Sequence, residues 1–330
     1  MQRLLEIENL KTYFPIRKGI FSKVVGNVHA VNGVSLEINA GETLGLVGES
    51  GCGKSTLGKT ILQLEKPTSG SIKFNGEELI GLPFKELKKV RANMQMVFQD
   101  PFSSLDPRMT IEQIIVEPLK LHGVGTKDSR RELAIELLNK VGLNETALYK
   151  YPHEFSGGQR QRVGIARALA LKPSIIIADE PVAALDVSVQ AQVLNLMNEL
   201  KKEFGLTYIF ISHDLGVIKY FSDKIAVMYL GKIVELSTSD NLYKHPVHPY
   251  TRALISSIPI SDPSNRKERV PLEGDVPSPI APPPGCSFHT RCPFAEDKCR
   301  KDIPELKTYE FEDVKHQVAC HFSERFINKN

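Results

Sequence analysis

Short apolar runs alternate with amphipathic stretches along most of this chain. Strands are predicted at "LLEIENL" and on both sides of a turn at 39–41 in "HAVNGVSLEINAGETLGLVGES", where the run 43–47 suits a buried parallel strand. Helical periodicity follows in "KSTLGKTILQL", and "SGSIKFNGEEL" predicts a small hairpin. Helix and strand then alternate in "QRVGIARALAL", "SIIIADE", "VQAQVLNLMNELKKEFG", "TYIFISHD" and "KIAVMYLGKIVE". This alternation predicts an α/β doubly wound sheet.

The pattern changes character twice. From about Asp106 to Phe155 it is helical, which indicates a helical subdomain at 101–159 inserted into a core formed by 1–100 and 160–245. The later run "PLEGDVPSPIAPPPG" is rich in proline, so we expect extended chain there and neither helix nor central strand. Residues 246–330 therefore constitute a small Pro/Cys-rich C-terminal extension.

Composition excludes some classes of protein. The 330 residues include 42 Lys and Arg against 39 Asp and Glu, which are interspersed, so nothing predicts a nucleic-acid partner. The opening "MQRLLEIENLKTYF" lacks the apolar centre of a signal peptide, and no apolar run approaches the ~18 residues that span a bilayer. We expect a cytoplasmic protein.

The segment "GESGCGKST" fits the phosphate-loop pattern G-x-x-x-x-G-K-[ST], and it follows a predicted strand and opens a predicted helix. Glycines let backbone N–H groups surround a phosphate, and the helix N-terminus adds partial positive charge. Lys54 should reach the β- and γ-phosphates, and the Ser55 hydroxyl should bind Mg²⁺. Cys52 occupies a variable position, so no catalytic thiol is expected. The predicted nucleotide-binding residues here are Gly48, Glu49, Ser50, Gly51, Cys52, Gly53, Lys54, Ser55 and Thr56.

Two acids follow the apolar run 175–178. Neighbouring side chains on a strand face opposite ways, so Asp179 and Glu180 can have different roles. Asp179 is predicted to hold Mg²⁺ through water, and Glu180 to act as the general base on the attacking water. The alternative is a pair of surface carboxylates, which is disfavoured because nucleotides bind at the carboxyl ends of such strands.

The segment "SGGQ" at 156–159 resembles the signature of ATP-binding-cassette (ABC) ATPases, and the other motifs of that family appear along the chain in the expected order. The resemblance implies a P-loop NTPase (RecA-like) ABC cassette over about residues 5–235, with ATP and Mg²⁺ as cofactors. It implies that Gln99 in "MVFQDP" senses the γ-phosphate and helps to bind Mg²⁺, and that His213 in "IFISHD" contacts the γ-phosphate. Gln99, Glu180 and His213 are thus the expected catalytic residues.

Two further motifs carry the same resemblance. Asp186 ends "VAALD", which resembles the D-loop, although Ala183 stands where serine is more usual. The aromatic pair in "TYFP" should stack on adenine, with Phe14 favoured over Tyr13.

A capping box is the simplest account of "SGGQ", since Ser156 and Gln159 can bond each other's backbone. It leaves Gly157 and Gly158 unexplained, each costing roughly 1 kcal/mol relative to alanine in a helix. Bare glycine backbone at a helix N-terminus suits an anion. The family resemblance implies a head-to-tail dimer in which these four residues clamp the γ-phosphate held by the other cassette. Two to four charge-assisted bonds of about 1.5–3 kcal/mol each would supply the roughly 5.5 kcal/mol of a full open–closed shift.

The end of the chain resembles the C-terminal extension of oligopeptide/dipeptide importer subunits, and the F-type subunit more than the D-type, in "HPVHPYTRALISSIPI", "LEGDVPSPIAPPPGCSFHTRCPFAEDKC" and "HQVACH". This implies a translocase ATPase, peripheral at the cytoplasmic face of the membrane, that powers peptide import. The implied partners are a second ABC cassette (a D-type paralogue or a second copy), two transmembrane permease subunits and, indirectly, a peptide-binding protein.

Three alternatives remain. The cassette could drive import of nickel or an oligosaccharide, since related importers share this extension. A non-transport ABC ATPase would have tandem cassettes or a basic stripe, which are absent from the sequence. A non-hydrolysing regulatory cassette is disfavoured by Glu180 and His213.

Four of the five cysteines, Cys286, Cys292, Cys299 and Cys320, fall near the C-terminus. Without an export signal, this spacing favours a metal site over disulfides. Four thiolates suit zinc or an iron–sulfur cluster alike. The family resemblance favours a structural [4Fe–4S] cluster, whereas the adjacent His289 and His321 keep Zn²⁺ open, and free thiols are the third possibility.

Overall fold

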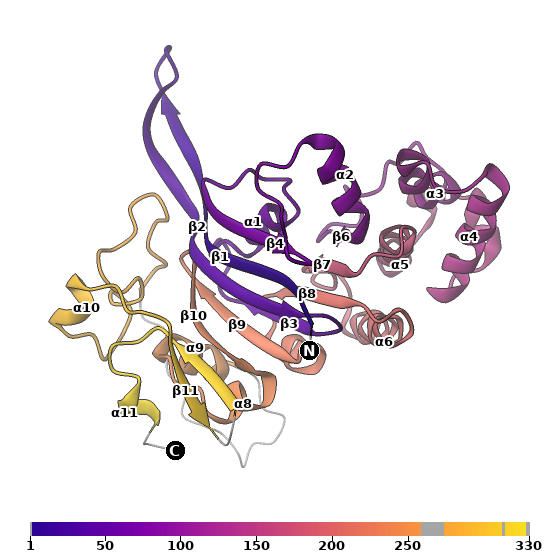
Figure 1. The fold of residues 1–330 in the computed structure, drawn as a ribbon. Helices are drawn as coiled ribbons and strands as arrows, with labels where there is room; N and C mark the ends of the chain where they lie inside the picture. The colour runs from indigo at the N-terminus through magenta and orange to yellow at the C-terminus, as the bar shows by residue number, and fades with distance from the viewer. Residues whose placement is uncertain (1, 259–273, 312–313, 328–330) are drawn as a thin grey trace. The chain divides into compact units, whose positions relative to one another are not determined.

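The computed structural model describes residues 2–258, 274–311 and 314–327 (Figure 1). These residues form two compact units. The signature unit comprises residue 2, 39–42 and 81–211, and the phosphate-loop unit comprises 3–38, 43–80 and the described residues from 212 onward. The C-terminal extension therefore belongs to the same unit as the phosphate loop.

The phosphate-loop unit contains two groups of strands. An antiparallel sheet has the order β2-β1-β4-β5, formed by β1 (Arg3–Lys18), β2 (Lys23–Asn39), β4 (Ser69–Phe74) and β5 (Glu77–Glu78). The second group has the order β3-β9-β10-β12-β11 and is formed by β3 (Thr43–Val47), β9 (Lys224–Tyr229), β10 (Lys232–Thr238), β12 (Val314–Val318) and β11 (Lys307–Phe311). Only β3 and β9 are parallel within this second group; the other described pairs are antiparallel.

The helices of this unit are short. They are α1 (Lys54–Ile61), α7 (Leu215–Phe221), α8 (Ser239–Lys244), α9 (Pro249–Ser256), α10 (Asp297–Lys301) and α11 (Glu324–Ile327). Helix α7 packs on β3 and α8 on β10. A small core of Val247, Val318 and Phe326 attaches the end of the chain to this unit.

The signature unit combines three parallel strands with helices. Its strands are β6 (Met94–Val97), β7 (Ile175–Asp179) and β8 (Thr207–Ser212). Every residue of β7 is buried, as expected for a strand covered on both faces. The helices are α2 (Phe84–Asn93), α3 (Ile111–His122), α4 (Lys127–Lys140), α5 (Gly157–Leu169) and α6 (Val187–Phe204), with 3₁₀ turns η1 (Glu145–Tyr149) and η2 (Pro152–Glu154). Helix α5 packs on α3, α4, α6 and β6.

Most local expectations are confirmed. The turn at 39–41 joins β2 to β3, with Gly41 in the left-handed region at φ 76°, and β4 and β5 form the small hairpin. The part of the proline-rich run at 274–285 contains neither helix nor strand, and its first residues, 271–273, lie outside the described residues. The long β1–β2 hairpin, which is clear in Figure 1, helix α2 and the β11–β12 pair are additional to what the pattern predicts. No helix in the described ranges has the length and apolar character needed to cross a membrane.

Candidate functional site

The phosphate loop joins β3 to α1, and glycine is required at two of its positions. A Cβ added to Gly48 would lie 2.2 Å from the Met228 carbonyl oxygen. At Gly53, where φ is 105°, a Cβ would lie 2.0 Å from the Ala30 carbonyl oxygen. Both neighbours are backbone atoms that cannot rotate away, so the loop owes its shape to close backbone packing as well as to conformational freedom.

Lys54 is buried in this loop. Its Nζ donates to the carbonyl oxygens of Gly48 at 2.7 Å and Glu49 at 3.0 Å, and it lies 3.7 Å from the Cys52 Sγ. Burial raises the pKa of the Cys52 thiol, which keeps it protonated and a weak nucleophile. The loop thus holds a cation at its centre, as binding of a polyphosphate requires.

Glu49 is held by two side chains from the C-terminal extension that the motif analysis did not identify. Its N–H donates to the Tyr250 hydroxyl at 2.9 Å, and its carboxylate accepts two bonds from the Arg291 guanidinium at 2.6 and 3.1 Å. No local signal in the sequence could have indicated these contacts, because they join residues about 200 positions or more apart.

The two aromatic candidates for adenine differ in their surroundings. The Tyr13 ring stacks on His29 with centroids 4.3 Å apart, and its hydroxyl donates to the Asn32 Oδ1 at 2.6 Å. Phe14 is on the same strand and is 36% exposed. Phe14 therefore offers the more accessible ring.

In the same unit, His213 is exposed and directly precedes Asp214, whose side chain caps α7.

The acidic pair lies in the signature unit, at the end of β7. Asp179 is 5% exposed. The Gln99 Nε2 donates to the Glu180 Oε2 at 3.0 Å, so two of the three predicted catalytic side chains are in contact. Glu180 has φ 46°, a left-handed conformation that costs a non-glycine residue roughly 1–2 kcal/mol. Strain of this kind is concentrated at functional positions.

The capping box at the start of α5 is confirmed. The Ser156 N–H donates to the Gln159 Oε1 at 3.0 Å, and the Gln159 N–H donates to the Ser156 Oγ at 3.4 Å. Capping does not explain Gly158, but packing within the chain gives a reason for this glycine in addition to the expected contact with another cassette. A Cβ there would lie 2.4 Å from the Val189 Cγ1 of α6. A Cβ added to the neighbouring Gly157 would make only an ordinary van der Waals contact. Asp186, the predicted D-loop residue, occupies the N-cap position of α6, and its side chain makes no capping bond.

The four C-terminal cysteines line one small cavity of about 20 Å³, together with His289 and His321. Burial raises the pKa of Cys292 to about 11 and that of Cys320 to about 12. Each histidine is bonded through one ring nitrogen to a backbone carbonyl. In the part of the chain that the structure describes, no three His, Cys, Asp or Glu side chains are arranged so that they could hold a metal ion.

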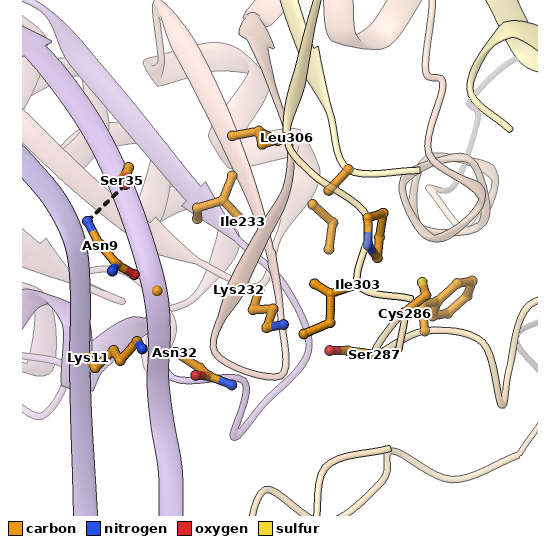
Figure 2. A pocket seen from close by; sticks show the side chains of 15 residues that line it. Asn9, Lys11, Asn32, Ser35, Lys232, Ile233, Cys286, Ser287, Ile303 and Leu306 are labelled. Atoms are coloured by element: carbon orange, nitrogen blue, oxygen red, sulfur yellow. Dashed lines mark hydrogen bonds between the residues drawn. The ribbon is translucent and has the colours of Figure 1, made fainter. Parts of the chain in front are cut away.

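A larger cavity of about 380 Å³ lies between β1, β2, β10 and the extension (Figure 2). Lys11, Lys232 and Cys286 line it, and burial lowers the pKa of Lys232. The described residues around it include none of the predicted nucleotide-binding residues, so we assign it no role.

Known families match both parts of the chain. The model of the ABC transporter family matches residues 31–183, and that of the oligopeptide/dipeptide transporter C-terminal region matches 234–299. The oligopeptide transport ATP-binding protein AppF of Bacillus subtilis is 56% identical over 97% of both chains. This chain belongs to the ABC transporter ATP-binding family. Two other members are OppF of Escherichia coli, 52% identical over 96% of this chain and 95% of its own, and the di/tripeptide transport protein DppF of Pseudomonas aeruginosa, 45% identical over 99% and 100%.

Solved structures support the same membership. A dimeric ABC cassette, MJ0796, in a post-hydrolysis state with ADP and phosphate, is 32% identical and has a TM-score of 0.64 over 72% of this chain and 99% of its own. The cassette cbiO1 of Clostridium perfringens is 28% identical, with a TM-score of 0.63 over 74% and 92%. Membership of the family makes this chain an ATPase with a P-loop ABC cassette fold.

Proposed function

We propose that this protein binds and hydrolyses ATP to power the import of di- or oligopeptides through a membrane transporter. One observation carries the proposal: the phosphate loop is joined, in a single unit, to an extension of the kind found in oligopeptide and dipeptide transporters. Relatives that are similar over nearly their whole length are peptide-transport ATP-binding proteins by name.

Each motif has a role in this proposal. The backbone of the phosphate loop, Lys54 and Ser55 bind the triphosphate and Mg²⁺, and Phe14 stacks on adenine. Asp179 holds Mg²⁺ and Glu180 accepts a proton from the attacking water. The bond from Gln99 to Glu180 orients that carboxylate. We divide the chain into a RecA-like core (1–100 and 160–245), a helical subdomain (101–159) and the extension (246–330).

The proposed working form is a dimer of cassettes beneath two permease subunits, at the cytoplasmic face of the membrane. Ser156 and the glycines after it would cover the γ-phosphate bound by the other cassette, which is a D-type paralogue or a second copy. The four-residue capping box supports this geometry because it leaves the N–H groups at the start of α5 in fixed positions.

Reconstitution of the transporter tests the proposal. ATP hydrolysis by the protein with its permeases in liposomes should rise when a peptide-loaded binding protein is added on the external side. The Glu180→Gln variant should bind ATP without this response. Stimulation by a nickel- or oligosaccharide-loaded binding protein, and not by a peptide-loaded one, would assign the cassette to another solute.

We propose that Cys286, Cys292, Cys299 and Cys320 bind a structural metal centre. They line a single cavity, and thiolates bind zinc and iron–sulfur clusters alike. The family resemblance favours a [4Fe–4S] cluster. The cavity of about 20 Å³ has room for a single water-sized species, so the thiols would have to move outward around four irons. They would have to shift for one Zn²⁺ as well, since no three of the described side chains are arranged to hold a metal ion.

Metal analysis of protein purified without oxygen distinguishes these centres. Iron with acid-labile sulfide, both absent from a Cys299→Ser variant, would establish the cluster. One zinc per chain, lost in the same variant, would establish Zn²⁺. Neither metal in freshly prepared, folded protein would leave four free thiols and refute the proposal.

A further inference from the structure

The C-terminal extension contacts the phosphate loop at Glu49. The ion pair between Glu49 and Arg291 is bidentate, with N–O distances of 2.6 and 3.1 Å. The Arg291 side chain is only 5% exposed and that of Glu49 25% exposed, so water screens the pair far less than it would a surface pair. This geometry is far better defined than that of a typical surface ion pair.

The same residue is held through its backbone. The Glu49 N–H donates to the hydroxyl of Tyr250, which is fully buried. The Glu49 carbonyl, at the other end of the residue, accepts a bond from the Lys54 Nζ at 3.0 Å. Tyr250 therefore holds the Gly48–Glu49 peptide group, whose Gly48 carbonyl also accepts a bond from the Lys54 Nζ at 2.7 Å, and Arg291 holds the side chain of the same residue.

Tyr250 and Arg291 are themselves rigidly supported. The rings of Tyr229, Tyr250 and Phe288 pack against one another with centroids 4.8 to 5.4 Å apart. The Arg291 N–H donates to the Phe288 carbonyl at 3.0 Å, which closes a turn between Cys286 and Cys292. Arg291 is thus presented by a compact turn packed under the loop and not by a flexible surface side chain.

The negative charge of Glu49 explains why the ion pair with Arg291 matters for nucleotide binding. A carboxylate in a loop that must bind a triphosphate repels the ligand, because like charges a few ångströms apart repel strongly where water screens them poorly. The Arg291 guanidinium neutralises the Glu49 carboxylate and keeps it in one orientation. Loss of Arg291 would leave the Glu49 carboxylate without its cation, and the loop would be less ordered.

We propose that Arg291 and Tyr250 are positioning residues for ATP binding, through which the C-terminal extension shapes the phosphate loop. The proposal rests on the proposed function, since it assumes that the loop binds ATP. It predicts that changes in the extension alter nucleotide affinity first and the rate of hydrolysis at saturation much less.

The test measures the affinity of the full-length protein for a fluorescent ATP analogue. Arg291→Met should weaken binding about tenfold, as expected for a coupled, partly buried charge. Glu49→Gln combined with Arg291→Met should recover most of that loss, because no unpaired carboxylate remains. Arg325→Met is the matched control, since it breaks an exposed ion pair with Glu296 in the same extension and should change nothing.

A second measurement does not depend on hydrolysis. Hydrogen exchange of the peptide that spans the loop should become faster in Tyr250→Phe, which keeps the ring but removes the acceptor of the Glu49 N–H, and should be unchanged in Arg325→Met. Unchanged affinity in Arg291→Met would overturn the proposal. A second result would also overturn the proposal: Arg291→Met weakens ATP binding, the double variant does not restore it, and hydrogen exchange in the loop is unchanged. That combination would indicate general destabilisation of the protein. If the unmodified protein binds no ATP, the proposed function itself fails.

Discussion

Gly158→Ala offers a direct test of the packing between α5 and α6. A methyl group at this position would lie 2.4 Å from the Val189 Cγ1, whereas ordinary contacts between such atoms are 3.4–4 Å. The two helices must therefore separate, or Val189 must leave its rotamer, by about 1 Å. Overpacking of this size costs about 1–3 kcal/mol, and the better helix propensity of alanine offsets about 1 kcal/mol of it. We expect a net loss of about 1 kcal/mol of stability.

The assay is urea unfolding of dilute, nucleotide-free protein, so that cassette dimers do not contribute. Val189→Ala removes the clashing methyl group from a partly buried position, and the double variant should regain the lost stability. If Gly158→Ala alone is as stable as the unmodified protein, or if Val189→Ala does not rescue it, the packing argument is wrong. The ATPase rate of the double variant then gives separate information. Full activity would mean that the glycine is needed only for packing, and a stable but inactive protein would support a second role at the γ-phosphate of the other cassette.

Three further predictions concern other parts of the chain. Glu180→Gln should lower the hydrolysis rate at least about 100-fold without weakening ATP binding, because the amide keeps an acceptor for Gln99 but cannot take a proton. A phosphate-release assay measures the rate, and Glu199→Gln, on the exposed side of α6, is the control. Burial lowers the pKa of His248 from 6.5 to about 4, so between these values the unfolded chain binds a proton that the folded chain does not. Stability should fall by about 3 kcal/mol as the pH drops through this window, and His248→Asn, which keeps an N-cap acceptor, should flatten the pH dependence measured by urea unfolding. Cys320→Ser should abolish the metal content of the protein, and an unchanged metal-to-protein ratio would place the centre elsewhere.

The features that sequence predicted well are local. The capping box of Ser156 and Gln159 spans three positions, the turn at Gly41 needs one glycine, and β7 is a short apolar run that ends in Asp179. Each depends on neighbours along the chain whose preferences agree with the final fold. The phosphate loop belongs to the same group, since its spacing alone places glycine and lysine where backbone packing requires them.

The features that sequence did not predict depend on residues far apart. Gly158 faces Val189 from another helix, and β12 pairs with β10 through the register Glu235↔Val318. No periodicity signals such a contact, because the partner's identity matters only after the chain has folded. For the same reason, the sequence offers Tyr13 as the second candidate for stacking on adenine and gives no sign that its ring is stacked on His29 of the neighbouring strand.

The ion pair between positions 49 and 291 has a consequence for biosynthesis. A ribosome makes the glycine-rich loop early and the arginine that steadies it only after 242 further positions have been decoded. Contacts of such long sequence separation form slowly, and domains mature as units while the chain emerges. The nascent cassette would thus reach its full affinity for nucleotide only after Arg291 has left the ribosome, and products truncated before that arginine would bind ATP more weakly.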